Sequence, residues 1–127
     1  MVTQIGIIGT GAWATTLGIL LGLDGKKTVL WSRTESRAQE LTAARVNERS
    51  LPGVAFPELM TISASLEEAV VNSNLVIIAV PSVTIRENIR KVRSAIPSES
   101  NIVCATKGIE VVSGKRMSQV IMEELTG

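Results

Sequence analysis

The 127-residue sequence predicts an α/β protein built on a doubly wound parallel sheet. Apolar runs of strand length alternate with segments of helical periodicity along the whole chain. One run, 75–80, is apolar throughout, as in a central parallel strand covered on both faces. A glycine turn, 9–14, joins the first expected strand to the first expected helix with the spacing G-x-G-x-x-A. Together these features predict a Rossmann-like sheet.

Turn and capping residues divide the chain into its expected elements. Strands are expected at 4–8, 28–31, 60–63, 75–80 and 102–105, and helices at 12–23, 35–47, 66–72, 82–95 and 115–125. Thr34 is the expected N-cap of the second helix, and Ser65 with Glu68 forms the expected capping box of the third. Residues 50–57, which contain Pro52, Gly53 and Pro57, are expected to be irregular. The order βαβαβ followed by βαβα leaves the sheet truncated before its sixth strand, with 102–105 at an edge.

The glycine turn lies where G-x-G-x-x-G/A indicates dinucleotide binding, between a strand and a helix. Gly9 permits the tight turn, and Gly11, which lacks a Cβ, lets a pyrophosphate approach the backbone. Ala14 is small enough for the helix to pack closely on the strand. The helix N-terminus then offers free N–H groups and a partial positive charge to the phosphates.

The same stretch has a rival interpretation as a membrane span. No charged residue occurs before Asp24, the apolar run reaches spanning length, and Gly18 with Gly22 forms a small-x-x-x-small pair. Residues 1–4, however, lack the basic side chains of a signal peptide, and the glycines cluster where a turn is needed. We therefore expect no membrane span.

Composition excludes several classes of function. A net charge of +1 and only two Trp, one Phe and no Tyr argue against a nucleic-acid partner. The absence of His excludes imidazole bases, Ser-His triads and histidine metal sites. Cys104, the single cysteine, lies in an apolar run and is expected to be a buried thiol. Because no intrachain disulfide can form, we expect a reducing, cytoplasmic location. Because the chain has no His and its carboxylate pairs have no metal-ligand company, we expect no metal site.

Charged residues elsewhere carry weaker indications. The segment 108–115 resembles a P-loop but is one residue too long, and Arg116 stands where Ser or Thr must hold magnesium. Several charges lie on the polar faces of the helices expected at 82–95 and 115–125, without any metal-ligand pattern. These are expected to be solvated surface charges: Arg86, Glu87, Arg90, Lys91, Arg93, Glu123 and Glu124.

Two cationic residues follow expected strands at the carboxyl edge of the sheet, where such folds bind ligands. Arg33 follows the second strand, at the position where an NAD site usually has Asp or Glu. A guanidinium can donate paired hydrogen bonds to a 2′-phosphate, so Arg33 favours NADP(H), while Glu35 leaves NAD(H) possible. Lys107 follows the fifth strand and could hold an anionic substrate, with a plain surface lysine as the alternative.

Several segments together resemble the N-terminal part of the bacterial-type NAD(P)-dependent glycerol-3-phosphate dehydrogenases. The matching pieces are GTGAWATTLG at 9–18, VLWSR at 29–33, RVNERSLPGVAFP at 45–57, LVIIAVPS at 75–82, ATKGIE at 105–110 and MSQVIMEEL at 117–125. Their order and spacing cover nearly the whole chain, which makes the resemblance specific.

The resemblance implies a role for individual residues. It implies that Trp13 contacts the cofactor and that Arg33 binds the adenosine ribose or its phosphate. Pro81 and Ser82 would lie beside the cofactor, and Lys107 near both the nicotinamide and the phosphorylated substrate. The implied reaction is the reversible reduction of dihydroxyacetone phosphate to sn-glycerol 3-phosphate for phospholipid synthesis, with the hydride carried by the nicotinamide.

The sequence also departs from the family pattern. Ala12 stands in the cofactor loop where the family often has serine, Ala14 replaces the third glycine, and Ser50 replaces a frequent tyrosine. The resemblance implies that the catalytic lysine and the helical substrate domain lie beyond Gly127. Residues 1–127 are thus expected to be the NAD(P)-binding domain, with no catalytic residue and no turnover alone. The sequence does not fix the oligomeric state, and a homodimer is kept open.

Two other interpretations remain open at this point. The chain could be the cofactor half of a different dehydrogenase of the 6-phosphogluconate or β-hydroxyacid type. It could also be a dinucleotide-binding module without catalysis.

Overall fold

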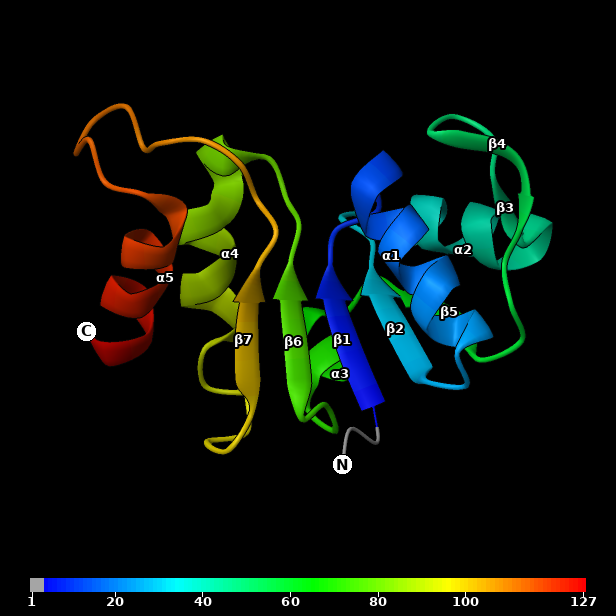
Figure 1. Cartoon of the computed structure of the whole chain (residues 1–127), viewed down its shortest axis with the longest axis horizontal. Coiled ribbons are helices and arrows are strands. Elements are labelled where there is room, and N and C mark those ends of the chain that lie inside the picture. The colour runs from blue at the N-terminus through cyan, green and yellow to red at the C-terminus, as the bar shows by residue number, and fades with distance from the viewer. Residues whose placement is uncertain (1–3) are drawn as a thin grey trace.

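The computed structural model describes residues 4–127 as a five-stranded parallel sheet with helices on both faces and a small antiparallel hairpin beyond one edge (Figure 1). The strands are β1 (Gln4–Ile8), β2 (Lys27–Trp31), β3 (Val46–Asn47), β4 (Leu51–Ala55), β5 (Met60–Ser63), β6 (Leu75–Ile78) and β7 (Asn101–Cys104). The helices are α1 (Ala12–Leu23), α2 (Glu35–Ala44), α3 (Leu66–Val70), the 3₁₀ turn η1 (Ser82–Thr84), α4 (Ile85–Val92) and α5 (Met117–Thr126).

The sheet has the strand order β5-β2-β1-β6-β7, and every pair in it is parallel. The order reverses between β1 and β6, since the chain builds outward from β1 to β5 and then returns to the other side. This is the doubly wound arrangement that the sequence predicts. Among residues 4–127, β7 pairs only with β6 and forms an edge, as expected for a sheet without a sixth strand.

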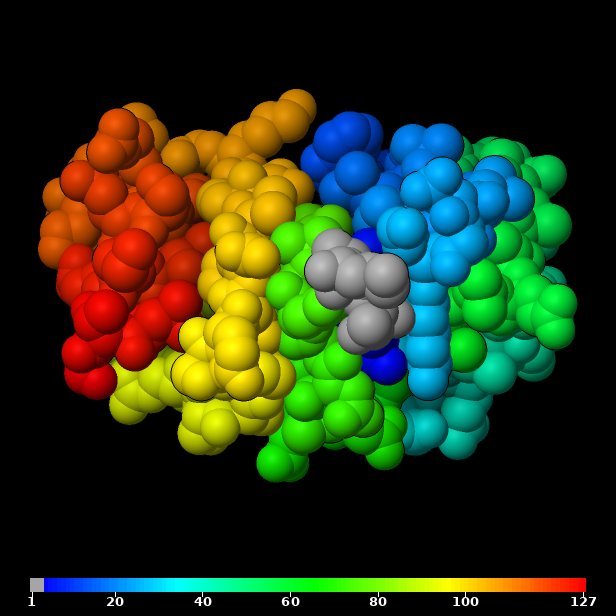
Figure 2. All heavy atoms as spheres, turned by 60° about the horizontal axis from the view of Figure 1, so that its bottom comes forward, coloured from blue at the N-terminus to red at the C-terminus, as the bar shows by residue number. Residues whose placement is uncertain are grey.

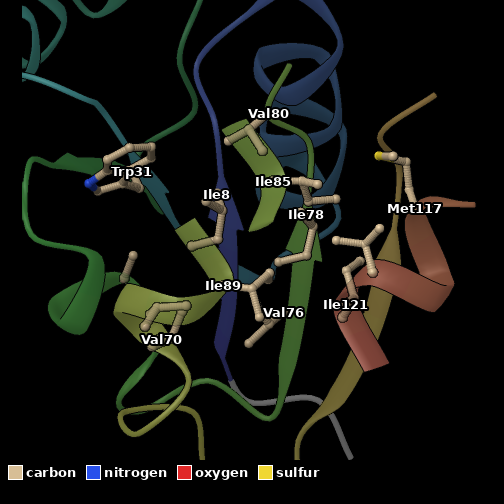
Figure 3. Close-up of a cluster of buried hydrophobic side chains, with 13 residues drawn as sticks. Ile8, Trp31, Val70, Val76, Ile78, Val80, Ile85, Ile89, Met117 and Ile121 are labelled. Atoms are coloured by element: carbon tan, nitrogen blue, oxygen red, sulfur yellow. The ribbon is translucent and has the colours of Figure 1, made fainter. Parts of the chain in front are cut away.

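The two faces of the sheet carry separate hydrophobic clusters because successive strand residues point to opposite sides. Ile8, Val76 and Ile78 belong to a cluster with α3, α4 and α5, which Figure 3 shows closing around Ile85, Ile89 and Met117. Ile5 and Ile7 belong to the other cluster, which includes residues of α1, α2 and β5. Burial on both faces explains why residues 5–8 of β1 and all of β6 carry no polar side chain.

The apolar N-terminal stretch becomes β1 and the 12-residue helix α1. Across residues 4–127, no helix combines the length and the hydropathy that a membrane crossing requires. At the amino edge of the sheet, the connecting segments 24–26, 71–74 and 93–100 lie over the strand ends (Figure 2). Because all five strands are parallel, their carboxyl ends share the opposite edge of the sheet (Figure 1).

The expected helix 35–47 was too long, and the irregular stretch after it contains a hairpin. Helix α2 stops because Arg45 adopts a left-handed conformation, with φ of 55°. Its guanidinium donates to the carbonyl oxygens of Met60 at 2.8 Å and Pro57 at 2.7 Å, and its own carbonyl accepts from Phe56 N–H at 2.7 Å. These contacts turn the chain so that β3 pairs with β4.

Smaller corrections concern the ends of other elements. Helix α3 stops at Val70, β6 at Ile78 and α4 at Val92, and α5 begins only at Met117. Thr34 caps α2 as expected, since its Oγ1 accepts from the N–H of Arg37 at 3.2 Å.

The expected capping box of α3 is only half formed. Ser65 Oγ accepts from the N–H of Glu68 at 3.1 Å, as a cap should. The carboxylate of Glu68, however, accepts from the hydroxyl of Ser63 at 2.6 Å, and the N–H of Ser65 donates to that same hydroxyl at 3.1 Å. The hydroxyl of Ser63, at the end of β5, therefore lies between the N–H of Ser65 and the carboxylate of Glu68, which would bond directly in a complete capping box.

Candidate dinucleotide-binding site

A cavity of about 910 Å³ opens at the carboxyl edge of the sheet. Its walls come from the loops after β1, β2, β6 and β7, together with α4 and the β3–β4 turn. It brings together all the residues that the sequence singled out: Gly9, Gly11, Ala12, Trp13, Arg33, Pro81, Ser82 and Lys107. They converge because the carboxyl ends of parallel strands meet at one edge.

The glycine loop and α1 form one wall of this cavity. Gly9 has φ of 140°, and a Cβ there would lie 2.4 Å from the carbonyl oxygen of Ala79, so the close approach of β1 and β6 requires glycine. Gly11 is different, because its φ of −73° suits any residue and a Cβ there would meet no heavy atom within 4 Å. Nothing in the described fold requires glycine at this position.

The N-terminus of α1 faces this open space without a side-chain cap. Gly11 is the N-cap residue, no side chain accepts a hydrogen bond there, and the first turn contains no acidic residue. By contrast, Thr34 caps α2 and Ser65 caps α3. An uncapped helix N-terminus beside a glycine suits a phosphate group, which would accept hydrogen bonds from the free N–H groups. The residues present therefore fit a pyrophosphate.

Positive charge is concentrated around the cavity. Five of the thirteen Lys and Arg residues of the chain line it: Arg33, Arg37, Arg49, Lys91 and Lys107. Glu87 is the one acidic residue among the lining residues, and it pairs with Lys91 at 2.6 Å. The chain as a whole carries a net charge of only +1, so this edge of the sheet attracts anions far more than the average surface does.

The acidic residue that left NAD(H) possible lies elsewhere. Glu35 lines a separate groove between α2 and β5, where its carboxylate accepts from Gln39 Nε2 at 3.4 Å. It is not among the lining residues of the 910 Å³ cavity. Arg33 lines that cavity, is exposed, and has no ion pair with any described residue.

The loop after β7 places Lys107 beside the loop after β6. Thr106 Oγ1 donates to the carbonyl oxygens of Val80 at 2.9 Å and Ile78 at 3.2 Å. Gly108 follows with φ of 112°, and a Cβ there would lie 3.6 Å from the side chain of Ser82. Lys107 is thereby held at the mouth of the cavity, exposed and without an ion pair to any residue in 4–127.

The two tryptophans line the cavity in different ways. Trp31 is only 9% exposed, and its indole Nε1 donates to the carbonyl oxygen of Ala64 at 3.0 Å. Trp13, at the start of α1, is 54% exposed. A large aromatic surface left open at this position is available to a bound ligand.

Several lining residues were missed by the sequence analysis. Arg37 reaches the cavity from α2, Arg49 from the β3–β4 turn, and Asn88 from α4. Ser50, which was expected only as a departure from the family pattern, also lines it. Asn88 is 7% exposed, and its Nδ2 donates to Thr84 Oγ1 at 3.3 Å. The Arg49 position had no detectable signal because the hairpin itself was not expected. Asn88 falls on a helix that was expected but whose polar face was judged to be solvated.

The charges of α4 and α5 were expected to be solvated surface charges, but several of them form ion pairs with one another. Glu124, with 8% of its side chain exposed, accepts from Arg90 Nη2 at 2.8 Å and from Arg86 Nη1 at 2.7 Å. Arg86 also donates two hydrogen bonds of 2.8 Å to Glu110, and Arg93 donates to the backbone carbonyl of Glu124 at 3.0 Å. We call these residues, with Lys115 and its partner Glu123, the α4–α5 ion cluster.

The ion cluster shifts the pKa values of its carboxylates. Hydrogen bonds from Arg90 and then Arg86 lower the pKa of Glu124 to about 2. Hydrogen bonds from Arg86 and then Ser113 lower the pKa of Glu110 to about 2. Glu110 follows Lys107 on the same loop, so the cluster fixes one end of the segment that carries this lysine.

Cys104, at the end of β7, is half-buried rather than fully buried as expected.

Comparisons with known proteins identify the family of the chain. The family model described as the N-terminus of NAD-dependent glycerol-3-phosphate dehydrogenase matches residues 4–127. Glycerol-3-phosphate dehydrogenases (NAD(P)+) from Chlorobium limicola and Dehalococcoides mccartyi are each 42% identical to the chain over 98% of its length. A crystal structure of glycerol-3-phosphate dehydrogenase from Coxiella burnetii superposes with a TM-score of 0.91 at 31% identity, covering 98% of this chain and 38% of that one.

The chain spans 37% of the Chlorobium relative and 35% of the Dehalococcoides relative. The match therefore concerns only part of a longer protein in each case, and the family model identifies that part as the N-terminal one. On the sequence match, the shared fold and the arrangement of the glycine loop, the chain belongs to the family of N-terminal domains of NAD-dependent glycerol-3-phosphate dehydrogenases.

Proposed function

We propose that this chain is the cofactor-binding domain of an sn-glycerol-3-phosphate dehydrogenase and that it prefers NADP(H) to NAD(H). The observation that carries the proposal is that five cationic side chains line the same cavity as the uncapped N-terminus of α1. A dinucleotide carries the pyrophosphate that this arrangement suits. The relatives that match over 98% of this chain are named glycerol-3-phosphate dehydrogenase (NAD(P)+).

In this proposal, each part of the cavity has one task. Gly9, Gly11 and Ala12 hold the pyrophosphate through backbone N–H groups, and Trp13 covers it with its exposed ring. Arg33 binds the adenosine ribose and its 2′-phosphate, since Glu35 is directed to another groove and does not repel it. Pro81 and Ser82 flank the other half of the cofactor.

The substrate side of the proposal rests on Lys107. When bound, the nicotinamide supplies or accepts the hydride that interconverts dihydroxyacetone phosphate and sn-glycerol 3-phosphate. Lys107, held by Thr106 and Gly108 beside Ser82, offsets the charge of the phosphorylated substrate at the cavity mouth. In this proposal the general acid is not among residues 4–127. It belongs to the part of the enzyme that corresponds to the unmatched length of the relatives.

The proposed setting is the cytoplasm, where dihydroxyacetone phosphate reduction serves phospholipid synthesis and where an unpaired Cys104 stays reduced. A homodimer is the proposed assembly of the complete enzyme. Sedimentation of that enzyme checks it, because a species of monomer mass would contradict it.

A titration of the purified chain with NADPH and with NADH tests the cofactor assignment. Saturable binding, tighter for NADPH, is the expected result. A chain that is folded by circular dichroism and binds neither dinucleotide would overturn the proposal, and equal affinities would overturn the NADP(H) preference. The chain alone is expected to leave a mixture of NADPH and dihydroxyacetone phosphate unchanged, so measurable turnover would place the catalytic groups within it.

A further inference from the structure

A second, smaller cavity adjoins the cofactor cavity at the end of β2. It has a volume of about 290 Å³, and three of its lining residues are arginines: Arg33 after β2, Arg37 on α2 and Arg49 in the β3–β4 turn. The hydroxyl-bearing residues Ser32 and Ser36 also line it, and Glu40 is the one carboxylate among its lining residues. Its walls are therefore almost entirely polar and carry an excess of positive charge.

Arg37 is held in a fixed orientation. Its side chain is 16% exposed, its Nη2 donates to Asn47 Oδ1 at 2.7 Å, and its Nη1 lies 3.2 Å from Glu40 Oε2. A guanidinium has five N–H donors, so these two contacts orient the group without using its full hydrogen-bonding capacity. A cation that is fixed before a ligand arrives loses little conformational entropy on binding.

Glu40 compensates two of the arginines at once. The same oxygen, Oε2, lies 3.2 Å from Arg37 and 3.7 Å from Arg49. Arg33 has no ion pair with any residue from 4 to 127. Three guanidinium groups and one carboxylate leave two positive charges in excess. A phosphomonoester, which carries about −1.5 to −2 at neutral pH, matches that excess.

We propose that Arg37 and Arg49 complete, with Arg33, a subsite for the 2′-phosphate on the adenosine ribose of NADP(H). This inference rests on the proposed function, because the ribose reaches this cavity only if the dinucleotide lies along the glycine loop. It assigns the cofactor preference to three arginines from three separate elements. Arg37 contributes the fixed donor, whereas Arg49, 71% exposed, contributes a second donor from the β3–β4 turn.

The test compares NADPH and NADH binding by calorimetry in the variants Arg37→Gln and Arg49→Gln. Each variant is expected to weaken NADPH by about tenfold or more, as loss of a hydrogen bond to a charged group does, while NADH stays within about twofold. Inorganic phosphate is expected to compete more strongly with NADPH than with NADH, because it can occupy the 2′-phosphate subsite in addition to the pyrophosphate position that both dinucleotides share. Arg116→Gln is the matched control, because Arg116 is exposed on the far side near α5 and its loss changes the net charge equally.

The outcomes separate this subsite from the proposed function. If the unmodified chain binds neither dinucleotide, the proposed function fails and the subsite with it. If the chain binds both but the variants leave the NADPH-to-NADH ratio unchanged, or weaken both equally, only the subsite is overturned. Should Arg37→Gln fail to fold, Arg49→Gln decides the question, since the exposed Arg49 side chain contributes little to the fold.

Discussion

The side-chain amide of Asn47 donates a hydrogen bond of 2.9 Å to the carbonyl oxygen of Thr10, in the middle of the glycine loop. The same Nδ2 lies 3.0 Å from Thr15 Oγ1 on α1, and Oδ1 accepts from Arg37 and from the N–H of Ser50. Asn47 is fully buried. One amide therefore connects α1, α2 and the β3–β4 hairpin to the loop that we assign to the pyrophosphate.

Replacing Asn47 with Asp tests this connection. The carboxylate can still accept from Arg37 and Ser50 but cannot donate to Thr10, so two oxygens would face each other in a buried site. We expect the free energy of unfolding to fall by about 1–3 kcal/mol and both dinucleotides to bind more weakly. Urea denaturation and calorimetry measure the two effects. Asn72→Asp, at an exposed position, is the control, and unchanged stability in Asn47→Asp would contradict the connection.

The two glycines of the loop should respond oppositely to valine. Gly11→Val should keep the thermal midpoint, because a Cβ at Gly11 meets no heavy atom within 4 Å, but should weaken both dinucleotides by more than about tenfold. Gly9→Val should lower the midpoint, because its Cβ would lie 2.4 Å from Ala79 O at a φ of 140°. Differential scanning calorimetry with parallel binding titrations distinguishes them. Normal binding by Gly11→Val would remove the pyrophosphate from this position.

Acid should weaken the α4–α5 ion cluster by protonating its carboxylates. The pKa values of Glu110 and Glu124 are lowered from 4.5 to about 2, so the folded state binds these protons less readily than the unfolded state. Their contribution to stability is therefore present above pH 4.5 and is lost as the pH falls from 4.5 toward 2.

The variant Glu124→Gln checks that contribution. It should have a lower thermal midpoint than the unmodified chain at pH 7, because Arg86 and Arg90 lose a shared counter-ion. The difference should shrink as the pH falls toward 2, where the unmodified carboxylate is itself protonated. Glu58→Gln, an exposed change that removes the same charge, is the matched control. A difference between Glu124→Gln and the unmodified chain that stays constant from pH 7 to pH 2 would contradict the assignment.

The two tryptophans predict which indole reports binding. Trp13 is 54% exposed on the glycine loop side, whereas Trp31 is 9% exposed and bonded to Ala64. Trp13→Phe should abolish most of the fluorescence change that NADPH causes, and Trp31→Phe should preserve it. The reverse result would mean that the dinucleotide approaches the sheet near β2 and leaves the start of α1 free.

Much of the fold could be predicted because its signals are local. The apolar runs of β1 and β6, the glycine turn and the cap at Thr34 each lie within a few neighbouring residues. The β3–β4 hairpin could not be predicted, because Arg45 ends α2 through contacts with Pro57 and Met60 that depend on the folded chain. The sequence pattern around Arg45 does not indicate these contacts, because the partners lie 12 and 15 residues away.

The candidate site divides in the same way. Strand ends converge in any parallel sheet, so Arg33 and Lys107 could be placed at one edge from the order of the elements alone. Arg37 and Arg49 could not, since their positions depend on the orientation of α2 and on the hairpin. The pairing of Arg86 with Glu124 was missed because 38 residues separate the partners.

The most direct test of the central claim is a ¹H–¹⁵N correlation spectrum of the labelled chain during titration with NADPH. The account predicts that the largest shifts fall on the amides of Gly9–Trp13 and on Arg33, Ser82 and Lys107, all of which line the 910 Å³ cavity. Shifts confined to the groove between α2 and β5, around Gln39 and Ile62, would contradict it, as would an unchanged spectrum.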